Sequence, residues 1–216
     1  HSETGNTMKH IPMLGAGTFR LEGQTAFDSV MMALKAGYRH IDTAQIYGNE
    51  QSVGDAMLAS GIARDEIFLT TKVWMNKLSK AEFRSSVEES LNKLQTSYID
   101  LLLIHWPLKD EKVSMLEYLT ELKAVKEAGL VKHIGVSNFN NQQLEQAIGI
   151  LGAGEIFTNQ VEVHPYLQNK KVVEFCKRND VLVTGYMPFA YGAVLKDEII
   201  LQLANKHGVT AAQIVL

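Results

Sequence analysis

The sequence predicts an α/β fold, a TIM (β/α)8 barrel in which parallel strands alternate with helices. Short aliphatic or β-branched runs alternate with longer amphipathic segments along almost the whole chain of 216 residues. Polar residues at the ends of successive apolar runs are 23 to 33 positions apart, which leaves room for one strand and one helix in each interval. Gly15 and Gly17 fit a dinucleotide-binding turn, but Arg20 stands where its third glycine is needed, which favours the barrel over a doubly wound sheet.

Seven strands are predicted from their apolar, β-branched composition. They span Gly15–Phe19, His40–Asp42, Ile67–Val73, Tyr98–His105, Lys132–Ser137, Ile156–Glu162 and Val181–Tyr186. Two helical segments carry apolar stripes that we expect to face the sheet, one made of Phe27, Val30, Met31 and Leu34, the other of Phe83, Val87, Leu91 and Leu94. Four glycines follow helical stretches, where a left-handed cap costs glycine little strain: Gly37, Gly61, Gly129 and Gly208.

The two ends of the chain carry further expectations. Residues 1–7 are polar and aperiodic and precede Met8, so we interpret them as a tag remnant and residues 8–216 as a single barrel domain. The segment from Thr210 to Gln213 matches the capping box that opens a helix, and the sequence stops at Leu216. We therefore expect the eighth strand and the C-terminal segment of the barrel to be absent from this chain.

Composition and charge exclude several classes of protein. The chain is 46% hydrophobic and 21% charged with a net charge of −3, which is typical of globular domains. Its basic residues are scattered, so no nucleic-acid or membrane-binding face is predicted, and no apolar run approaches the roughly 18 residues of a membrane span. Cys176 has no cysteine partner and is predicted to fill a buried space. We expect a cytoplasmic protein that binds a small molecule and no metal.

Four polar side chains are predicted to meet at one end of the barrel. Asp42, Lys72 and His105 each end an apolar run, and Tyr47 follows Asp42 by five residues in the next loop. In a barrel, the carboxyl ends of the strands and the loops after them form the catalytic face. Buried charges need partners, so Asp42 is expected to pair with Lys72. The positive charge of Lys72 would lower the pKa of Tyr47, a candidate general acid, and a neutral His105 would orient a substrate carbonyl.

Five longer segments resemble the signature stretches of the aldo-keto reductase family, in order and at family spacing. They read GYRHIDTAQIYGNE, TTKVW, IDLLLIHWP, KHIGVSNF and NQVEVHPYLQ. The similarity covers Ile11 to Leu216, and several long motifs that match together are far more specific than any one of them. Within the family the chain resembles the bacterial 2,5-diketo-D-gluconate reductases, especially the B type. The resemblance implies reduction of aldehydes and ketones by NADPH, with 2,5-diketo-D-gluconate and methylglyoxal-like small dicarbonyls as substrates.

The resemblance also implies a role for each site residue. It makes Tyr47 the proton donor, Lys72 and Asp42 the groups that tune its pKa, and His105 the group that orients the carbonyl. Residues implied to contact the cofactor are Gly17, Thr18, Asp42, Ser137, Asn138, Gln160, Tyr186, Met187 and Phe189, with the nicotinamide stacked on Tyr186. Many relatives have serine where this chain has Met187. Trp74 and Trp106 are implied as walls of the substrate pocket, although rim packing explains them equally well. A monomer is the usual state of the family.

Two other classes of function stay open at this stage. A non-catalytic binding or structural protein could share this fold and keep the pocket without turnover. The intact set of four catalytic candidates favours an enzyme instead. A barrel aldolase would use Lys72 to form a Schiff base, and borohydride would then trap a carbonyl substrate on Lys72 without any nucleotide. That alternative leaves the polar residues at the ends of the later strands unexplained.

Overall fold

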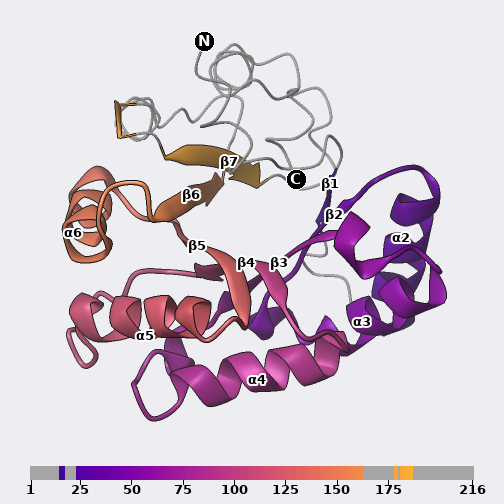
Figure 1. Ribbon diagram of the computed structural model, residues 1–216, viewed down its shortest axis with the longest axis horizontal. Coiled ribbons are helices and arrows are strands. Elements are labelled where there is room, and N and C mark those ends of the chain that lie inside the picture. Colours follow the sequence, from indigo (N-terminus) through magenta and orange to yellow (C-terminus); the bar gives the residue numbers. More distant parts are fainter. Residues whose placement is uncertain (1–14, 18–22, 163–177, 180, 187–216) are drawn as a thin grey trace.

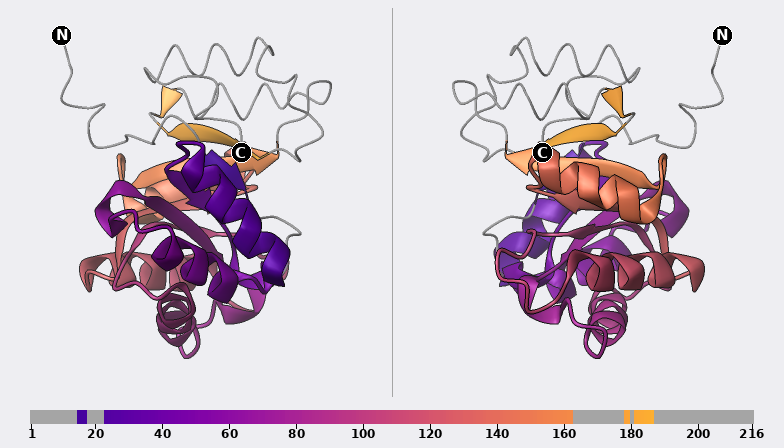
Figure 2. Two further views of the ribbon diagram at one scale, coloured as in Figure 1. Left: turned by 90° about the vertical axis from the view of Figure 1, so that its right-hand side faces the viewer. Right: turned by 90° about the vertical axis from the view of Figure 1, so that its left-hand side faces the viewer.

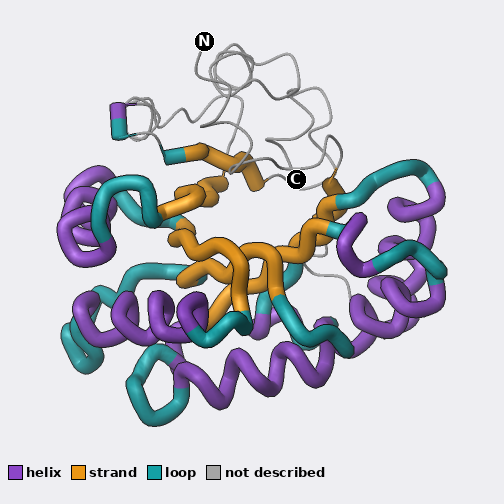
Figure 3. Tube along the Cα trace, viewed as in Figure 1, coloured by secondary structure: helices purple, strands orange, loops and turns teal. Residues whose placement is uncertain are grey.

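Seven parallel strands form one sheet in the order in which they follow each other along the chain. The computed structural model describes residues 15–17, 23–162, 178–179 and 181–186. Within these ranges the strands are β1 (Gly15–Gly17), β2 (His40–Asp42), β3 (Phe68–Val73), β4 (Ile99–Ile104), β5 (Val131–Ser137), β6 (Ile156–Glu162) and β7 (Leu182–Tyr186). Figure 3 shows the strands curving around a common centre, with helices outside them. The predicted α/β barrel class is confirmed.

Helices connect the strands and cover the outside of the sheet (Figures 1 and 2). The helices are α2 (Gly23–Lys35), α3 (Glu50–Ala59), α4 (Phe83–Leu94), α5 (Met115–Glu127) and α6 (Asn141–Leu151). In the described loops lie three short 3-10 helices: η1 (Gln45–Tyr47), η2 (Arg64–Glu66) and η3 (Met75–Lys77). Because all neighbouring strands are parallel, their carboxyl ends lie at one edge of the sheet.

The predicted elements agree closely with the described ones. The strand predicted over Tyr98–His105 is shorter at both ends, so His105 lies in the loop just after β4. Both apolar stripes pack as expected, with the Phe83 stripe of α4 buried along its length. Gly37, Gly61 and Gly129 have φ values of 99°, 71° and 80°, the left-handed conformation that their places predict. The predictions for Cys176, Gly208 and residues 210–213 lie outside the described residues.

The apolar core forms two layers, because neighbouring residues of a strand point to opposite faces of the sheet. The outer layer lies between strands and helices and includes Leu102 and Ile104 of β4. The inner layer lies inside the curved sheet, where Leu101 and Leu103 pack with Phe68 and Phe157. This filled interior leaves the carboxyl edge of the sheet as the place where polar side chains gather.

A buried histidine lies in the interior toward the amino ends of the strands. His40 is 1% exposed, and its Nε2 lies 3.0 Å from the Thr70 hydroxyl. Its ring lies perpendicular to the Phe68 ring, with the ring centres 5.3 Å apart. Burial lowers the pKa of His40 to about 4, and the nearby Asp42 carboxylate only partly offsets this effect. The folded protein therefore holds this imidazole in its neutral form at pH values where a free histidine is protonated.

The folded protein should lose stability as the pH falls from about 6.5 toward 4, because the unfolded chain binds a proton at His40 that the folded chain does not bind. At pH 5.5 this group alone should lower the free energy of unfolding by about 1.4 kcal/mol relative to pH 8. Urea unfolding of wild type and His40→Gln at both pH values measures the effect, and the variant should show the smaller loss. Equal losses in the two proteins would contradict the assignment.

Candidate active site

A buried ion pair lies at the centre of the polar edge. Asp42 and Lys72 end or nearly end the neighbouring strands β2 and β3, and Lys72 Nζ donates to Asp42 Oδ1 at 2.5 Å. The two residues are 3% and 1% exposed. Lys72 Nζ also donates to the main-chain oxygen of Thr43 at 3.2 Å. The predicted pairing is therefore present, and it satisfies two charges that would be costly to bury alone.

Tyr47 lies beside this pair at the end of the 3-10 helix η1. Its hydroxyl is 3.5 Å from Lys72 Nζ, and the ammonium also lies 5.2 Å from the centre of the tyrosine ring. Burial raises the pKa of Tyr47, and the negative charge of Asp42 raises it further. The expectation of a lowered pKa is therefore wrong for the site as it stands, because burial and the charge of Asp42 both act in the opposite direction. The phenol keeps its proton at neutral pH.

His105 faces both Tyr47 and Trp74 from the loop after β4. Its ring lies edge-on to the Tyr47 ring at 5.8 Å and 85°, and to the Trp74 ring at 5.1 Å and 78°. Burial lowers the pKa of His105 to about 3, and the positive charge of Lys72 lowers it further. The neutral imidazole that the sequence required is therefore the form present at neutral pH. Its Nδ1 is buried and has no hydrogen-bond partner in the described part of the chain.

Three polar residues at the ends of β5 and β6 join the same site from its other side. Gln160 Nε2 donates to Asp42 Oδ2 at 2.5 Å across 118 positions of sequence. The Ser137 hydroxyl donates to the main-chain oxygen of Gln160 at 2.8 Å, and Asn138 Nδ2 donates to the main-chain oxygen of His105 at 3.0 Å. Asn138 has a φ of 62°, so its left-handed backbone turns the chain sharply after β5.

A further amide, which no sequence pattern predicted, holds this turn in place. Asn159 is fully buried on β6, accepts from the Phe139 main-chain nitrogen at 3.3 Å and donates to the Phe139 oxygen at 2.9 Å. The Asn159 side chain thus makes the two hydrogen bonds to Phe139 that the main chain of a neighbouring strand would make. Only its position beside Gln160 in the NQ pair could have pointed to the site.

Several apolar side chains directly adjoin site residues in the chain. Trp74 directly follows β3 and contacts His105. Trp106, which follows His105 in the chain, is 43% exposed. Ile46 and Met75 are also exposed near the rim, at 49% and 37%. Sequence reasoning missed these two residues, although each directly adjoins a predicted site residue in the chain. Exposed apolar groups around a polar centre are typical of a small-molecule pocket.

The remaining predicted site residues are placed only by the backbone or lie outside the described ranges. Gly17 ends β1 and pairs in register with Asp42, and Tyr186 ends β7 opposite Glu162, so both reach the carboxyl edge. Thr18, Met187 and Phe189 lie outside the described residues. Among the side chains that the structure places, no three His, Cys, Asp or Glu groups could hold a metal ion. None of the described helices is long and apolar enough to cross a membrane.

Comparison with known proteins identifies relatives of the whole arrangement. The aldo/keto reductase family model matches residues 13–216. Methylglyoxal reductase DkgB of Yersinia pestis is 52% identical over 206 residues, which cover 95% of this chain and 77% of that protein. The crystal structure of a protein assigned as a 2,5-diketo-D-gluconic acid reductase B is 45% identical, with a TM-score of 0.81 over 96% of this chain and 76% of the other.

A third relative was solved with a cofactor. The Bombyx mori aldo-keto reductase in complex with NADP is 32% identical, with a TM-score of 0.76 over 93% of this chain and 74% of the other. The family match extends over almost the whole chain, and the sequence and structural relatives agree with it. The chain therefore belongs to the aldo/keto reductase family and is an oxidoreductase.

Proposed function

We propose that this protein uses NADPH to reduce the carbonyl group of small dicarbonyls, such as methylglyoxal and 2,5-diketo-D-gluconate, to an alcohol. The observation that carries the proposal is the meeting of a protonated phenol and a neutral imidazole beside a buried ion pair. Tyr47 and His105 are both uncharged hydrogen-bond donors at neutral pH, and their rings lie 5.8 Å apart. One carbonyl oxygen could accept hydrogen bonds from both groups.

Each residue has a distinct part in the reaction. The bound cofactor supplies the hydride to the carbonyl carbon. The N–H of His105 orients the carbonyl oxygen, and the Tyr47 hydroxyl transfers its proton to that oxygen as negative charge develops there. The phenolate left behind is stabilised by Lys72 Nζ, which lies 3.5 Å from the Tyr47 oxygen. Lys72 thus acts after the proton has left, rather than by acidifying the resting phenol.

The contacts of Lys72 argue against the aldolase alternative. Its Nζ donates to Asp42, to the Thr43 main-chain oxygen and to Tyr47, so all three protons of an ammonium group have acceptors. A Schiff-base nucleophile needs a lone pair on that nitrogen. With its three N–H groups directed at these acceptors, the ammonium group of the resting site has no lone pair to offer a carbonyl carbon.

The residues at the ends of β5 and β6 fit a nicotinamide cofactor. A carboxamide both donates and accepts hydrogen bonds, and Ser137, Asn138 and Gln160 offer a hydroxyl and two primary amides that do the same. We assign these three residues to the carboxamide and Tyr186, at the end of β7, to the face of the ring. Gly17, Thr18, Met187 and Phe189 complete the proposed cofactor site. The choice of NADPH is supported by the NADP complex of the Bombyx mori relative.

The proposed substrate class is supported by the apolar residues beside the site and by the relatives. Trp74, Trp106 and Ile46 would enclose a small carbonyl compound, and the name of the Yersinia pestis relative, methylglyoxal reductase, supports one of this size. All four catalytic groups come from one chain, which supports action as a monomer. The single cysteine in the sequence fits a reducing compartment, and we propose the cytoplasm.

The direct test follows NADPH oxidation at 340 nm with methylglyoxal or 2,5-diketo-D-gluconate, using NADH for comparison. Tyr47→Phe should lower kcat at least about 100-fold because it removes the donated proton, while the dissociation constant of NADPH changes less than about twofold. Tyr38→Phe, which removes the same atom at the opposite end of β2, is the matched control and should keep its activity. Normal turnover by Tyr47→Phe would refute the assigned role, and no turnover by wild type with any carbonyl would refute the proposed function.

Lys72→Met should lose both activity and stability, whereas Asp42→Asn combined with Lys72→Met should recover stability alone. The single variant leaves a buried carboxylate without its partner, which costs about 3–5 kcal/mol of unfolding free energy. The double variant removes both charges, but it still lacks the ammonium group that stabilises the phenolate. Urea unfolding and NADPH oxidation measured on the same samples separate the two effects. Recovery of turnover in the double variant would contradict the role of Lys72.

Asn138→Gly should weaken NADPH binding roughly tenfold, the loss expected for one hydrogen bond of about 1.4 kcal/mol. Glycine keeps the left-handed backbone at this position and removes only the amide. Gln95→Gly is the matched control, because Gln95 has a φ of 57° at the end of α4 and lies away from the cofactor side. Quenching of tryptophan fluorescence by NADPH gives both dissociation constants. Equal affinities of the two variants would argue against a carboxamide contact by Asn138.

A further inference from the structure

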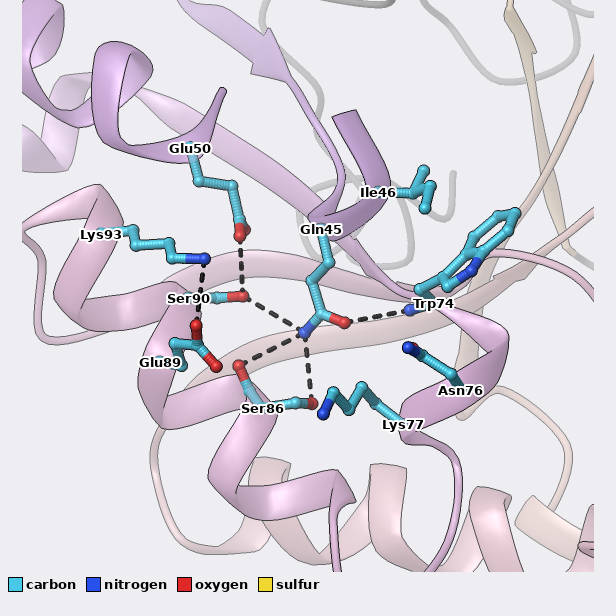
Figure 4. A pocket seen from close by; sticks show the side chains of 10 residues that line it. All are labelled: Gln45, Ile46, Glu50, Trp74, Asn76, Lys77, Ser86, Glu89, Ser90 and Lys93. Carbon is cyan, nitrogen blue, oxygen red and sulfur yellow. Dashed lines mark hydrogen bonds and ion pairs between the residues drawn. The ribbon is translucent and has the colours of Figure 1, made fainter. Parts of the chain in front are cut away.

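The side chain of Gln45 joins the catalytic loop to two other elements (Figure 4). Its Oε1 accepts a hydrogen bond from the Trp74 main-chain nitrogen at 3.0 Å. Its Nε2 donates toward α4, where the Ser86 hydroxyl lies at 3.2 Å, the Ser86 main-chain oxygen at 3.3 Å and the Ser90 hydroxyl at 3.2 Å. Gln45 begins η1, the short helix that ends with Tyr47. One amide therefore connects the tyrosine loop, the end of β3 and α4.

From Ser90 the hydrogen bonds continue through Glu50 to Thr71 of β3, the strand that carries Lys72. The Ser90 hydroxyl donates to Glu50 Oε1 at 3.2 Å, and the Thr71 hydroxyl donates to Glu50 Oε2 at 2.8 Å. Thr71 immediately precedes Lys72 on β3. Gln45, Glu50, Thr71, Ser86 and Ser90, which we call the Gln45 cluster, thus reach the residues beside both Tyr47 and Lys72.

Helices α3 and α4 approach so closely that this network has little freedom to shift. A Cβ atom at Gly54 of α3 would lie 2.5 Å from the Lys93 main-chain oxygen of α4. Glycine at this position therefore permits the contact between the two helices. Because α4 is fixed against α3, the hydroxyls of Ser86 and Ser90 form a rigid anchor for the Gln45 amide.

Hydrogen bonds, rather than packing, hold Gln45 in its place. The residue is half-buried and borders a cavity of about 170 Å³ (Figure 4). Gln45 and Tyr47 of η1 are only partly buried and Ile46 is exposed, so packing alone fixes this short helix weakly. The base of the loop is closed by the Thr43 hydroxyl, which donates to Asn49 Oδ1 at 2.6 Å. The Gln45 amide adds hydrogen bonds that fix the loop against Trp74 and α4.

We infer that Gln45 is a positioning residue for the reaction, because its amide sets the place of the Tyr47 hydroxyl relative to Lys72 and holds the Trp74 wall against His105. The inference rests on the proposed reductase function. Misplacement of a reacting group by about 1 Å can cost a factor on the order of 100 in rate. Tyr47 is the only one of the four catalytic candidates borne by a short 3-10 helix, so it depends most on such a contact.

The main variant is Gln45→Leu, which keeps a similar volume and removes both arms of the amide. Its kcat for methylglyoxal should fall about tenfold, because Tyr47 reaches the transferring geometry less often. NADPH affinity should stay unchanged, since the partners of the Gln45 amide, Trp74, Ser86 and Ser90, are not among the proposed cofactor residues. The solvent deuterium isotope effect on kcat should rise as proton transfer becomes slower. A variant that merely left fewer molecules folded would lower kcat without changing that isotope effect.

Gln51→Leu is the matched control. It makes the same replacement at an exposed position of α3, where the glutamine side chain donates to Asp55 at 3.2 Å. Its kcat and isotope effect should equal those of wild type.

The fluorescence of Trp74 gives a second readout that needs no turnover. The sequence has two tryptophans, so Trp106→Phe leaves Trp74 as the single emitter. Adding Gln45→Leu to this background should make Trp74 more accessible to acrylamide and shift its emission to the red. If Gln45→Leu does not fold, the double variant Ser86→Ala, Ser90→Ala removes the hydroxyl anchors and should change both readouts in the same direction.

The inference would be overturned if the Gln45 or serine variants had the same isotope effect, turnover and Trp74 quenching as wild type. Absence of carbonyl reduction by the wild-type protein would instead refute the proposed function. Trp74 quenching would still report whether Gln45 holds the wall of the site, so the two failures can be told apart.

Discussion

The buried pair of Asp42 and Lys72 is the interaction on which the rest of the site depends. Two charges that are almost fully removed from water are tolerated only if nearly every polar atom around them has a partner. The Thr43 main-chain oxygen and the Gln160 amide supply such partners, from the loop after β2 and from the distant strand β6. The hydrogen bonds of one ion pair therefore connect the carboxyl ends of β2, β3 and β6.

The neutrality of this pair decides the charge state of its neighbours. Because the carboxylate and the ammonium largely cancel, loss of water dominates the electrostatics of both Tyr47 and His105. It raises the pKa of the phenol and lowers that of the imidazole, so both groups are uncharged in the resting site. In the proposed mechanism, Lys72 acts when charge appears, since its ammonium lies 3.5 Å from the Tyr47 oxygen that would become a phenolate. An uncharged phenol and imidazole with the Lys72 ammonium nearby would suit a reaction that creates negative charge on oxygen.

The sequence predicts the strands of this fold better than the state of its site. Apolar runs that end in Asp42 and Lys72 require those residues at one edge of a parallel sheet, and the ion pair follows from that requirement. The pKa of Tyr47 could not be predicted in the same way, because its direction depends mainly on how deeply the folded chain buries the phenol, and secondly on the nearby charge of Asp42. The role of Gln45 was equally hidden. Its partners on α4 are 41 and 45 positions away, and no periodic pattern marks a hydrogen bond between a loop and the side of a helix.

Strands and amide side chains divide the work of placing the site. Asp42, Lys72 and Gln160 lie on strands, whose main-chain hydrogen bonds fix them. Tyr47 and the turn after β5 lie in loops outside the strand ladder, where Gln45 and Asn159 add side-chain hydrogen bonds to those of the main chain. An amide suits this purpose because it both donates and accepts, so one side chain can bridge two elements. It also adds no charge, and a charged bridge at the same place would disturb the balance that keeps Tyr47 protonated and His105 neutral.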